Sequence, residues 1–235
     1  MQRSDQSWGI LAVTLIWMTD VHRRIRTSRP LALMSPGPNR PMPPKEAVAL
    51  MDRVNYYQPI EDAEIPRRFY RTVKLNGVGD RASWSAFPAL TNCGFALVNA
   101  RARSCLDRLA LGTNSILPIE IYDNDGSTFL RDDISILLCR ERKRSIDLDR
   151  STAFRKAFPS SRFHTLDVLR EEQNSGTVQL LPEALIGPDL WIDPLVGERL
   201  FFSEAAAQSF RAAGIFKDFK AKAIFADQCN SGPWD

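Results

Sequence analysis

Residues 187–214, G-P-D-L-W-I-D-P-L-V-G-E-R-L-F-F-S-E-A-A-A-Q-S-F-R-A-A-G, begin with two short apolar runs that predict a β-hairpin. The first run covers residues 189–193, and the second covers residues 198–202. Pro194 and Gly197 lie between the runs, and these residue types are typical of a turn that joins two strands. The segment therefore predicts two neighbouring strands that run in opposite directions.

The rest of this segment predicts a helix with a defined start and end. Ser203 stands where an N-cap is needed, because its hydroxyl accepts a hydrogen bond from an amide of the first turn. Glu204 follows at the positive end of the helix dipole, and Gly214 is a typical residue just after a helix. We expect the strands and the helix to share one core made of large side chains: Trp191, Ile192, Leu200, Phe202 and Phe210.

A second hairpin is predicted between residues 116–122 and 128–138. The sequence D-N-D-G at residues 123–126 is a strong turn signal between two apolar strands. The acidic side chains of this turn also suggest a calcium loop, but the further ligands and the closing glutamate of such a loop are missing. The sequence therefore favours a plain hairpin turn.

The remaining pattern favours an α+β fold. A helix is predicted for about residues 92–111, with Asn92 as its cap and a continuous apolar face. Arg101, Arg103 and Arg108 fall elsewhere on this helix and predict its solvent-facing side rather than a phosphate site. Because strands and helices do not alternate regularly along the chain, we expect a mostly antiparallel sheet with helices packed on one face.

Three of these stretches resemble the eleventh immunity-protein family of bacterial polymorphic toxin systems. They are residues 117–123, 134–151 and 189–214, and the resemblance covers roughly residues 85–220. The clearest of the three has a strand, a second strand that closes on Ser203, and a helix that ends in Ala-Gly. The resemblance implies a bacterial, cytoplasmic immunity protein that neutralises a toxin encoded nearby by direct stoichiometric binding, without a cofactor or chemistry of its own.

Four residues are candidates for contact with such a partner. Protein interfaces favour Trp, Tyr and Arg as the residues that contribute most of the binding energy. By that rule we expect contacts from residues on or beside predicted loops: Trp84, Tyr122, Arg140 and Arg199. A core position is an equally good interpretation of Trp84.

The charge distribution argues against a nucleic-acid partner. Residues 1–44 contain six Arg and two Asp, whereas the rest of the chain contains 25 Lys or Arg and 26 Asp or Glu. The basic excess therefore lies in the N-terminal part, while dedicated nucleic-acid binders usually have a basic body. We expect binding specificity to come from shape and a few anchors rather than from bulk charge.

The first 44 residues are predicted to lie outside the core. Six of the 15 prolines fall between residues 30 and 44, which is typical of an extended or disordered linker. The apolar run at residues 8–18 is shorter than the about 20 residues of a membrane helix, so no stable membrane insertion is expected. We therefore expect a basic, Pro-rich extension at 1–44, either disordered or outside the true translation start, and a single α+β domain at 45–235.

An enzyme is the alternative class. The two histidines are His22, in the N-terminal extension, and His164. A small hydrolase or transferase would have to use His164 with Asp147 or Asp149, but the apolar neighbours of this histidine favour a packed strand position. The cysteines lack the spacing of a zinc site and are expected to be free, buried thiols: Cys93, Cys105, Cys139 and Cys229.

Overall fold

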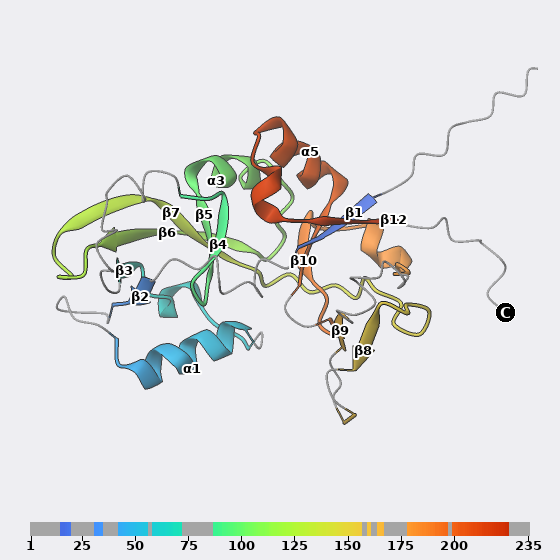
Figure 1. Cartoon of the computed structure of the whole chain (residues 1–235), viewed down its shortest axis with the longest axis horizontal. Helices are drawn as coiled ribbons and strands as arrows, with labels where there is room; N and C mark the ends of the chain where they lie inside the picture. Colours follow the sequence, from blue (N-terminus) through green and yellow to red (C-terminus); the bar gives the residue numbers. More distant parts are fainter. Residues whose placement is uncertain are drawn as a thin grey trace, which may run out of the picture.

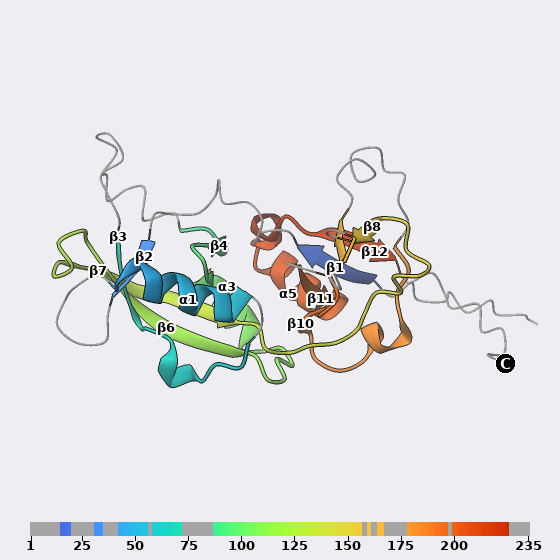
Figure 2. The ribbon, with the colours of Figure 1, turned by 90° about the horizontal axis from the view of Figure 1, so that it is seen from below.

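The computed structural model describes residues 15–19, 31–34, 42–55, 58–71, 87–156, 159–160, 164–166, 178–196 and 199–225. Figures 1 and 2 show two sheets side by side along the longest axis of the molecule. The six-stranded sheet has the order β2-β3-β6-β7-β5-β4, and the four-stranded sheet has the order β10-β11-β1-β12. Only β3 and β6 pair in parallel among the strands described, so the predicted α+β class with mostly antiparallel sheets is confirmed.

The described elements have the following bounds. The six-stranded sheet contains β2 (Leu31–Leu33), β3 (Arg68–Arg71), β4 (Leu90–Asn92), β5 (Ala96–Asn99), β6 (Ser115–Tyr122) and β7 (Phe129–Leu138). The four-stranded sheet contains β1 (Leu15–Thr19), β10 (Leu190–Ile192), β11 (Leu200–Ser203) and β12 (Lys222–Phe225), while β8 (Phe154–Lys156) pairs with β9 (His164–Leu166). The helices are α1 (Pro44–Asn55), α3 (Ala100–Leu106) and α5 (Glu204–Ala212), with short 3-10 turns at η3 (Asp62–Glu64), η4 (Pro182–Leu185) and η5 (Phe216–Phe219).

The predicted strand–strand–helix unit near the C-terminus is confirmed. Strands β10 and β11 pair in antiparallel fashion, and the Ser203 hydroxyl accepts a hydrogen bond from the amide of Ala206 at 3.1 Å. Gly214 follows α5 with φ of +67°, a conformation that glycine adopts without steric cost. The prediction that Trp191 shares a core with Phe202 and Phe210 is wrong. The Trp191 ring stacks on Phe201 on the opposite face of the four-stranded sheet.

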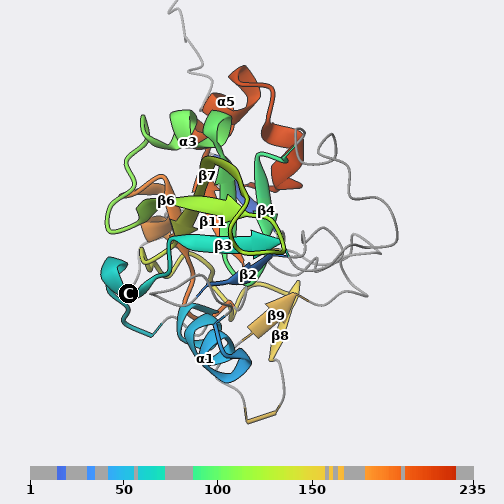
Figure 3. The same cartoon turned by 90° about the vertical axis from the view of Figure 1, so that its left-hand side faces the viewer.

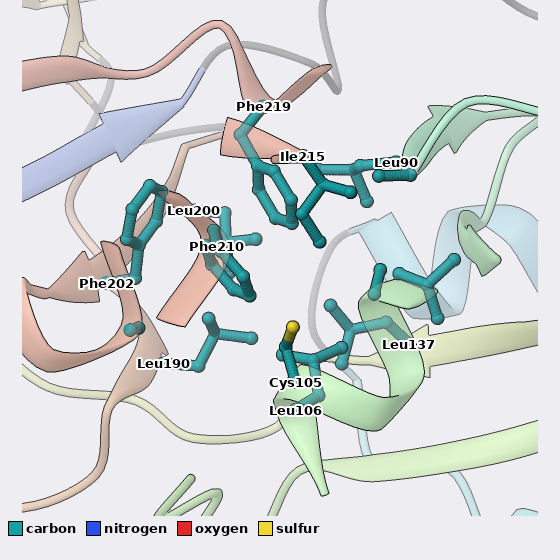
Figure 4. Packing of buried hydrophobic residues seen from close by; sticks show 14 of the residues in the cluster. Leu90, Cys105, Leu106, Leu137, Leu190, Leu200, Phe202, Phe210, Ile215 and Phe219 are labelled. Atoms are coloured by element: carbon teal, nitrogen blue, oxygen red, sulfur yellow. The ribbon is translucent and has the colours of Figure 1, made fainter. Parts of the chain in front are cut away.

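A large apolar cluster joins the two sheets. Figure 4 shows side chains of α3, β4 and β7 meeting side chains of β10, β11, α5 and η5. Phe210 and Phe219 stack with ring centroids 4.1 Å apart, and Phe202 meets both rings edge to face. Helix α1 covers the other face of the six-stranded sheet through Ala47, Leu50 and other residues of a second cluster. The described helices therefore lie on both faces of that sheet, and the prediction that they pack on one face is wrong.

A hydrogen-bonded seam reinforces this junction. The buried side chain of Asn114 donates to the carbonyl of Leu190 at 2.8 Å and accepts from the amides of Arg140 and Glu141. The amide of Ile192 donates to the carbonyl of Glu141 at 3.0 Å, so the chain that leaves β7 runs beside β10. The two sheets are therefore joined by backbone pairing as well as by apolar contact.

The predicted helix at residues 92–111 is wrong at both ends, because α3 covers only Ala100–Leu106. Strands β4 and β5 occupy residues 90–92 and 96–99, and α3 begins only at Ala100 with Asn99 as its cap. Gly94 turns the chain between the strands with φ of +94°, and a Cβ there would lie 2.1 Å from the sulfur of Met51. Because Ala96, Leu97 and Val98 are all buried, this strand lacks the alternation that distinguishes a strand from a helix.

The prediction that residues 1–44 lie outside the core is wrong for both of their described strands. Strand β1 lies inside the four-stranded sheet, paired with β11 on one side and β12 on the other. Ile16 and Met18 are buried, and the Trp17 indole donates to Glu204 at 2.6 Å. Strand β2 forms an edge of the six-stranded sheet beside β3. The stretch with the six prolines, residues 30–44, therefore contains β2 and the first residue of α1 and does not mark the start of the fold.

Candidate functional site

An aromatic and charged cluster occupies the exposed end of the β6–β7 hairpin. The ring of Phe129 is 52% exposed and meets the ring of Tyr122 edge to face, with centroids 5.9 Å apart. The guanidinium of Arg68 lies over the Tyr122 ring at 4.4 Å. Glu120 accepts a hydrogen bond from the Tyr122 hydroxyl at 2.7 Å and pairs with Arg68 at 3.4 Å. We refer to Arg68, Glu120, Tyr122 and Phe129 as the hairpin-tip cluster.

Strand pairing explains why these four residues meet. Tyr122 stands directly opposite Phe129 in the antiparallel β6–β7 pair, and Arg68 stands opposite Glu120 in the parallel β3–β6 pair. Glu120 and Tyr122 share one face of β6 because side chains alternate along a strand. Ile121, which stands between them, is buried.

The turn beside the cluster is ordered by its own acidic side chains. Arg71 donates two hydrogen bonds to Asp123, from Nε at 3.0 Å and from Nη2 at 2.6 Å. The carboxylate of Asp125 accepts bonds from the Thr128 hydroxyl and from the amides of Thr128 and Ser127, and these donors lower its pKa to about 2. The predicted hairpin turn is thus confirmed, and it presents the cluster in a defined geometry.

The structure does not bring the four predicted contact residues together. Tyr122 belongs to the hairpin-tip cluster, whereas Trp84 lies outside the described residues. The guanidinium of Arg140 contacts Ser115, the carbonyl of Ile60 and Asp62, and so joins residues 60–62 to the start of β6. Arg199 is only 4% exposed, which is inconsistent with a direct contact between its side chain and a partner.

Sequence reasoning missed three members of the hairpin-tip cluster: Arg68, Glu120 and Phe129. Phe129 has a usable signal, because a hairpin turn at residues 123–126 places it across from Tyr122. Arg68 has no local signal, since its position depends on the parallel pairing of β3 with β6 across about 50 residues of chain. The exposure of the Phe129 ring is likewise a property of the folded sheet.

The residues of the alternative enzyme site serve local structure. The backbone of His164 donates to the carbonyl of Leu195 at 2.7 Å, and its Nδ1 atom is buried without a hydrogen-bond partner among the described residues. The carboxylate of Asp147 accepts from the amides of Asp149 and Arg150 at 3.2 Å each, as in an Asx turn. Across the described ranges, no hydrogen bond joins His164 to either aspartate.

Three of the four cysteines lie in the described residues, and all three are free thiols. Burial raises the pKa of Cys93 and of Cys139 to about 12, so these thiols stay protonated at neutral pH. Within the same part of the chain, no group of three or more His, Cys, Asp or Glu side chains is placed to hold a metal ion. Cys229 lies outside the described residues.

Comparison with known proteins adds no assignment. The chain matches no protein-family model, and no curated protein matches it significantly. The resemblance to the immunity-protein family therefore remains a prediction from the three stretches at residues 117–123, 134–151 and 189–214. No helix in the described ranges has the length and apolar character needed to cross a membrane.

Proposed function

We propose that this protein is a bacterial, cytoplasmic immunity protein that neutralises one toxin, encoded beside it, by forming a stoichiometric complex. The observation that supports this proposal most strongly is the hairpin-tip cluster, in which the exposed ring of Phe129 lies beside the half-buried ring of Tyr122 and the guanidinium of Arg68. One of the three stretches that resemble the immunity-protein family, residues 117–123, contains Tyr122 of this cluster. The resemblance and the surface chemistry thus favour the same strand.

The composition of the cluster fits a protein-binding anchor. In protein interfaces, the residues whose substitution by alanine weakens binding by about 2 kcal/mol or more are most often Trp, Tyr and Arg. Covering the exposed half of the Phe129 ring removes apolar surface from water, which contributes about 1 kcal/mol. The arginine and tyrosine offer a cation–π contact that strengthens when a partner excludes water.

The geometry of the cluster also lowers the entropy cost of binding. The contacts of Arg68 and Glu120 with Tyr122 hold the side chains in place before any partner arrives. Side chains that are ordered in advance lose less conformational freedom when a complex forms. The side chains of the hairpin-tip cluster therefore have the same contacts before a partner binds, and less conformational entropy is lost on binding.

Co-expression tests the proposal. We expect a sensitive host that expresses the toxin-like product of the neighbouring gene to survive when it also expresses this protein, and to die with an empty vector. The two purified proteins should elute together from a size-exclusion column in a one-to-one complex. Continued killing together with separate elution would contradict the proposal and favour the enzyme alternative at His164.

A further inference from the structure

Helices α3 (Ala100–Leu106) and α5 (Glu204–Ala212) and the segment after α5 carry an excess of basic residues. Helices α3 and α5 lie side by side above the sheets, and η5 follows α5 directly, as Figures 1 and 3 show. The Cys105 thiol of α3 approaches the carbonyl of Ser209 in α5 at 3.8 Å, which fixes the two helices together. We refer to residues 100–108 and 204–222 as the basic helical face. Its basic residues are Arg101, Arg103, Arg108, Arg211, Lys217, Lys220 and Lys222.

The three acidic residues of this face are engaged within the fold. Asp107 pairs with Arg103 at 3.8 Å, and Glu204 pairs with Arg211 at 2.8 Å. Asp218 accepts a hydrogen bond from the amide of Ala89 at 2.9 Å. Each of these three carboxylates therefore has a partner within the fold.

Several of the cations remain open to solvent. Arg108, Lys217 and Lys220 are exposed, and none of them forms an ion pair with a described acidic residue. Arg101 is also exposed and donates to the carbonyl of Ala213 at the end of α5, so its charge is held at the surface. The face has an excess of cations over acidic residues, and such an excess attracts a negative surface.

The rest of the body has the opposite sign. Residues 45–235 carry a formal charge of −1, and the basic helical face carries +4, so the remainder of that body carries −5. The near neutrality of the sequence thus conceals a separation of charge between this face and the rest. Such a separation orients a charged partner during its approach and raises the association rate.

We propose that the basic helical face docks against an acidic surface of the toxin, an inference that rests on the proposed function. The chemistry of the face also restricts which toxin surface it meets. A toxin cleft that binds nucleic-acid phosphates is itself basic, so this face would repel it. The face fits instead an acidic surface, either beside such a cleft or on a toxin with another kind of substrate.

Charge reversal with a matched control tests this inference. The variant Arg108→Glu/Lys217→Glu removes exposed cations of the face, while Lys45→Glu/Lys156→Glu makes the same change in net charge at exposed positions on α1 and β8. Association of each purified variant with the neighbouring-gene product is measured by biolayer interferometry over a range of salt concentrations. Circular dichroism melts verify that all the proteins are folded.

We expect the face variant to associate on the order of tenfold more slowly at low salt, with a weaker dependence on salt, and the control to stay within about twofold of the wild type. If wild type and face variant bind with equal rates, the acidic docking surface is contradicted and the proposed function stands. If the wild type forms no complex, both proposals fail. Salt-dependent binding of a labelled DNA duplex that the face variant loses would assign this face to nucleic acid and overturn the inference.

Discussion

The two sheets of this protein are assembled from very different distances along the chain. In the six-stranded sheet, β4 pairs with β5 and β6 pairs with β7 through short turns, and the N-terminal strand β2 lies only at the edge. In the four-stranded sheet, the N-terminal strand β1 lies between β11 and β12 from the other end of the chain. One sheet is thus mostly local, whereas the other depends on a strand brought from about 180 residues away.

This difference distinguishes the four-stranded sheet, which we expect to determine global stability, from the six-stranded sheet, which carries the proposed binding surface. Contacts between distant residues form only after the chain entropy of a long loop has been lost, so the four-stranded sheet should close late in folding. The hairpin-tip cluster belongs to the local sheet and does not use β1. We therefore expect the proposed binding surface to be less sensitive to the N-terminus than the global stability is.

Removal of residues 1–20 should have the largest effect, because it deletes the strand on which this contrast depends. The deletion removes the buried side chains of Ile16 and Met18, whose burial contributes about 1.5–3 kcal/mol each, and leaves two unpaired strand edges on β11 and β12. The two side chains together contribute about 3–6 kcal/mol, which reaches the lower end of the stability of a typical domain, about 5–15 kcal/mol. Hydrogen exchange should show lost protection in β11 and β12 and retained protection in β6 and β7. An unchanged melting curve would contradict the central position of β1.

Phe210→Ala tests the cluster that joins the two sheets. The ring is fully buried between Phe202 and Phe219, so its removal should lower the free energy of unfolding by about 3–5 kcal/mol. Phe129→Ala, which removes a half-exposed ring, should change it by less than about 0.5 kcal/mol. Urea unfolding of both variants gives the comparison. Equal losses would show that the hairpin tip is part of the core.

Asn114→Ala tests the hydrogen-bonded seam between the sheets. Without the side-chain amide, two amides and one carbonyl lose their partner in a buried position, at a cost of about 1–3 kcal/mol. Asn124→Ala, in the exposed hairpin turn, is the control and should be nearly neutral. Both free energies come from chemical denaturation. A neutral Asn114→Ala would mean that the apolar cluster alone joins the two sheets.

Ser203→Ala should have the smallest effect on stability among these tests, because it removes one helix cap and one hydrogen bond to Asp189 within the four-stranded half. The Ser203 hydroxyl satisfies the amide of Ala206, and losing such a cap costs about 1 kcal/mol. Ser104→Ala, inside α3, lacks a capping role and should cost less than about 0.5 kcal/mol. Thermal melts of the two variants should therefore differ. Equal melting temperatures would contradict a stabilising role for the Ser203 cap.

The contrast between the sheets also explains what the sequence alone could predict. The unit at residues 189–214 and the hairpin at residues 116–138 carry turn and cap signals within a few residues of their strands, and both predictions are confirmed. Strand β1 has no such signal, because its pairing depends on residues 200–203 and 222–225. Strand β5 is buried on both faces, so its apolar run has no strand alternation and the sequence pattern alone does not distinguish it from part of a helix.

The same distinction applies to the candidate site. Tyr122 is identifiable from its residue type and its place beside a predicted turn, and Phe129 follows from the hairpin register. Arg68 joins them only through the parallel β3–β6 pair, and the burial of Arg199 depends on the packing of β11. Residue type therefore identifies a candidate contact residue where a local turn places it at the surface. It fails where the pairing of distant strands determines whether the side chain is exposed.

The most direct test of the account is the affinity of the toxin for one altered ring at the hairpin tip. Calorimetric titration compares the wild type with Phe129→Ala and with Val48→Ala, a control on α1 whose side chain is equally exposed at 52%. We predict that Phe129→Ala raises the dissociation constant on the order of 30-fold, equivalent to about 2 kcal/mol, while Val48→Ala stays within about twofold. Equal affinities for wild type and Phe129→Ala, with both proteins folded, would contradict the hairpin-tip cluster as the binding anchor.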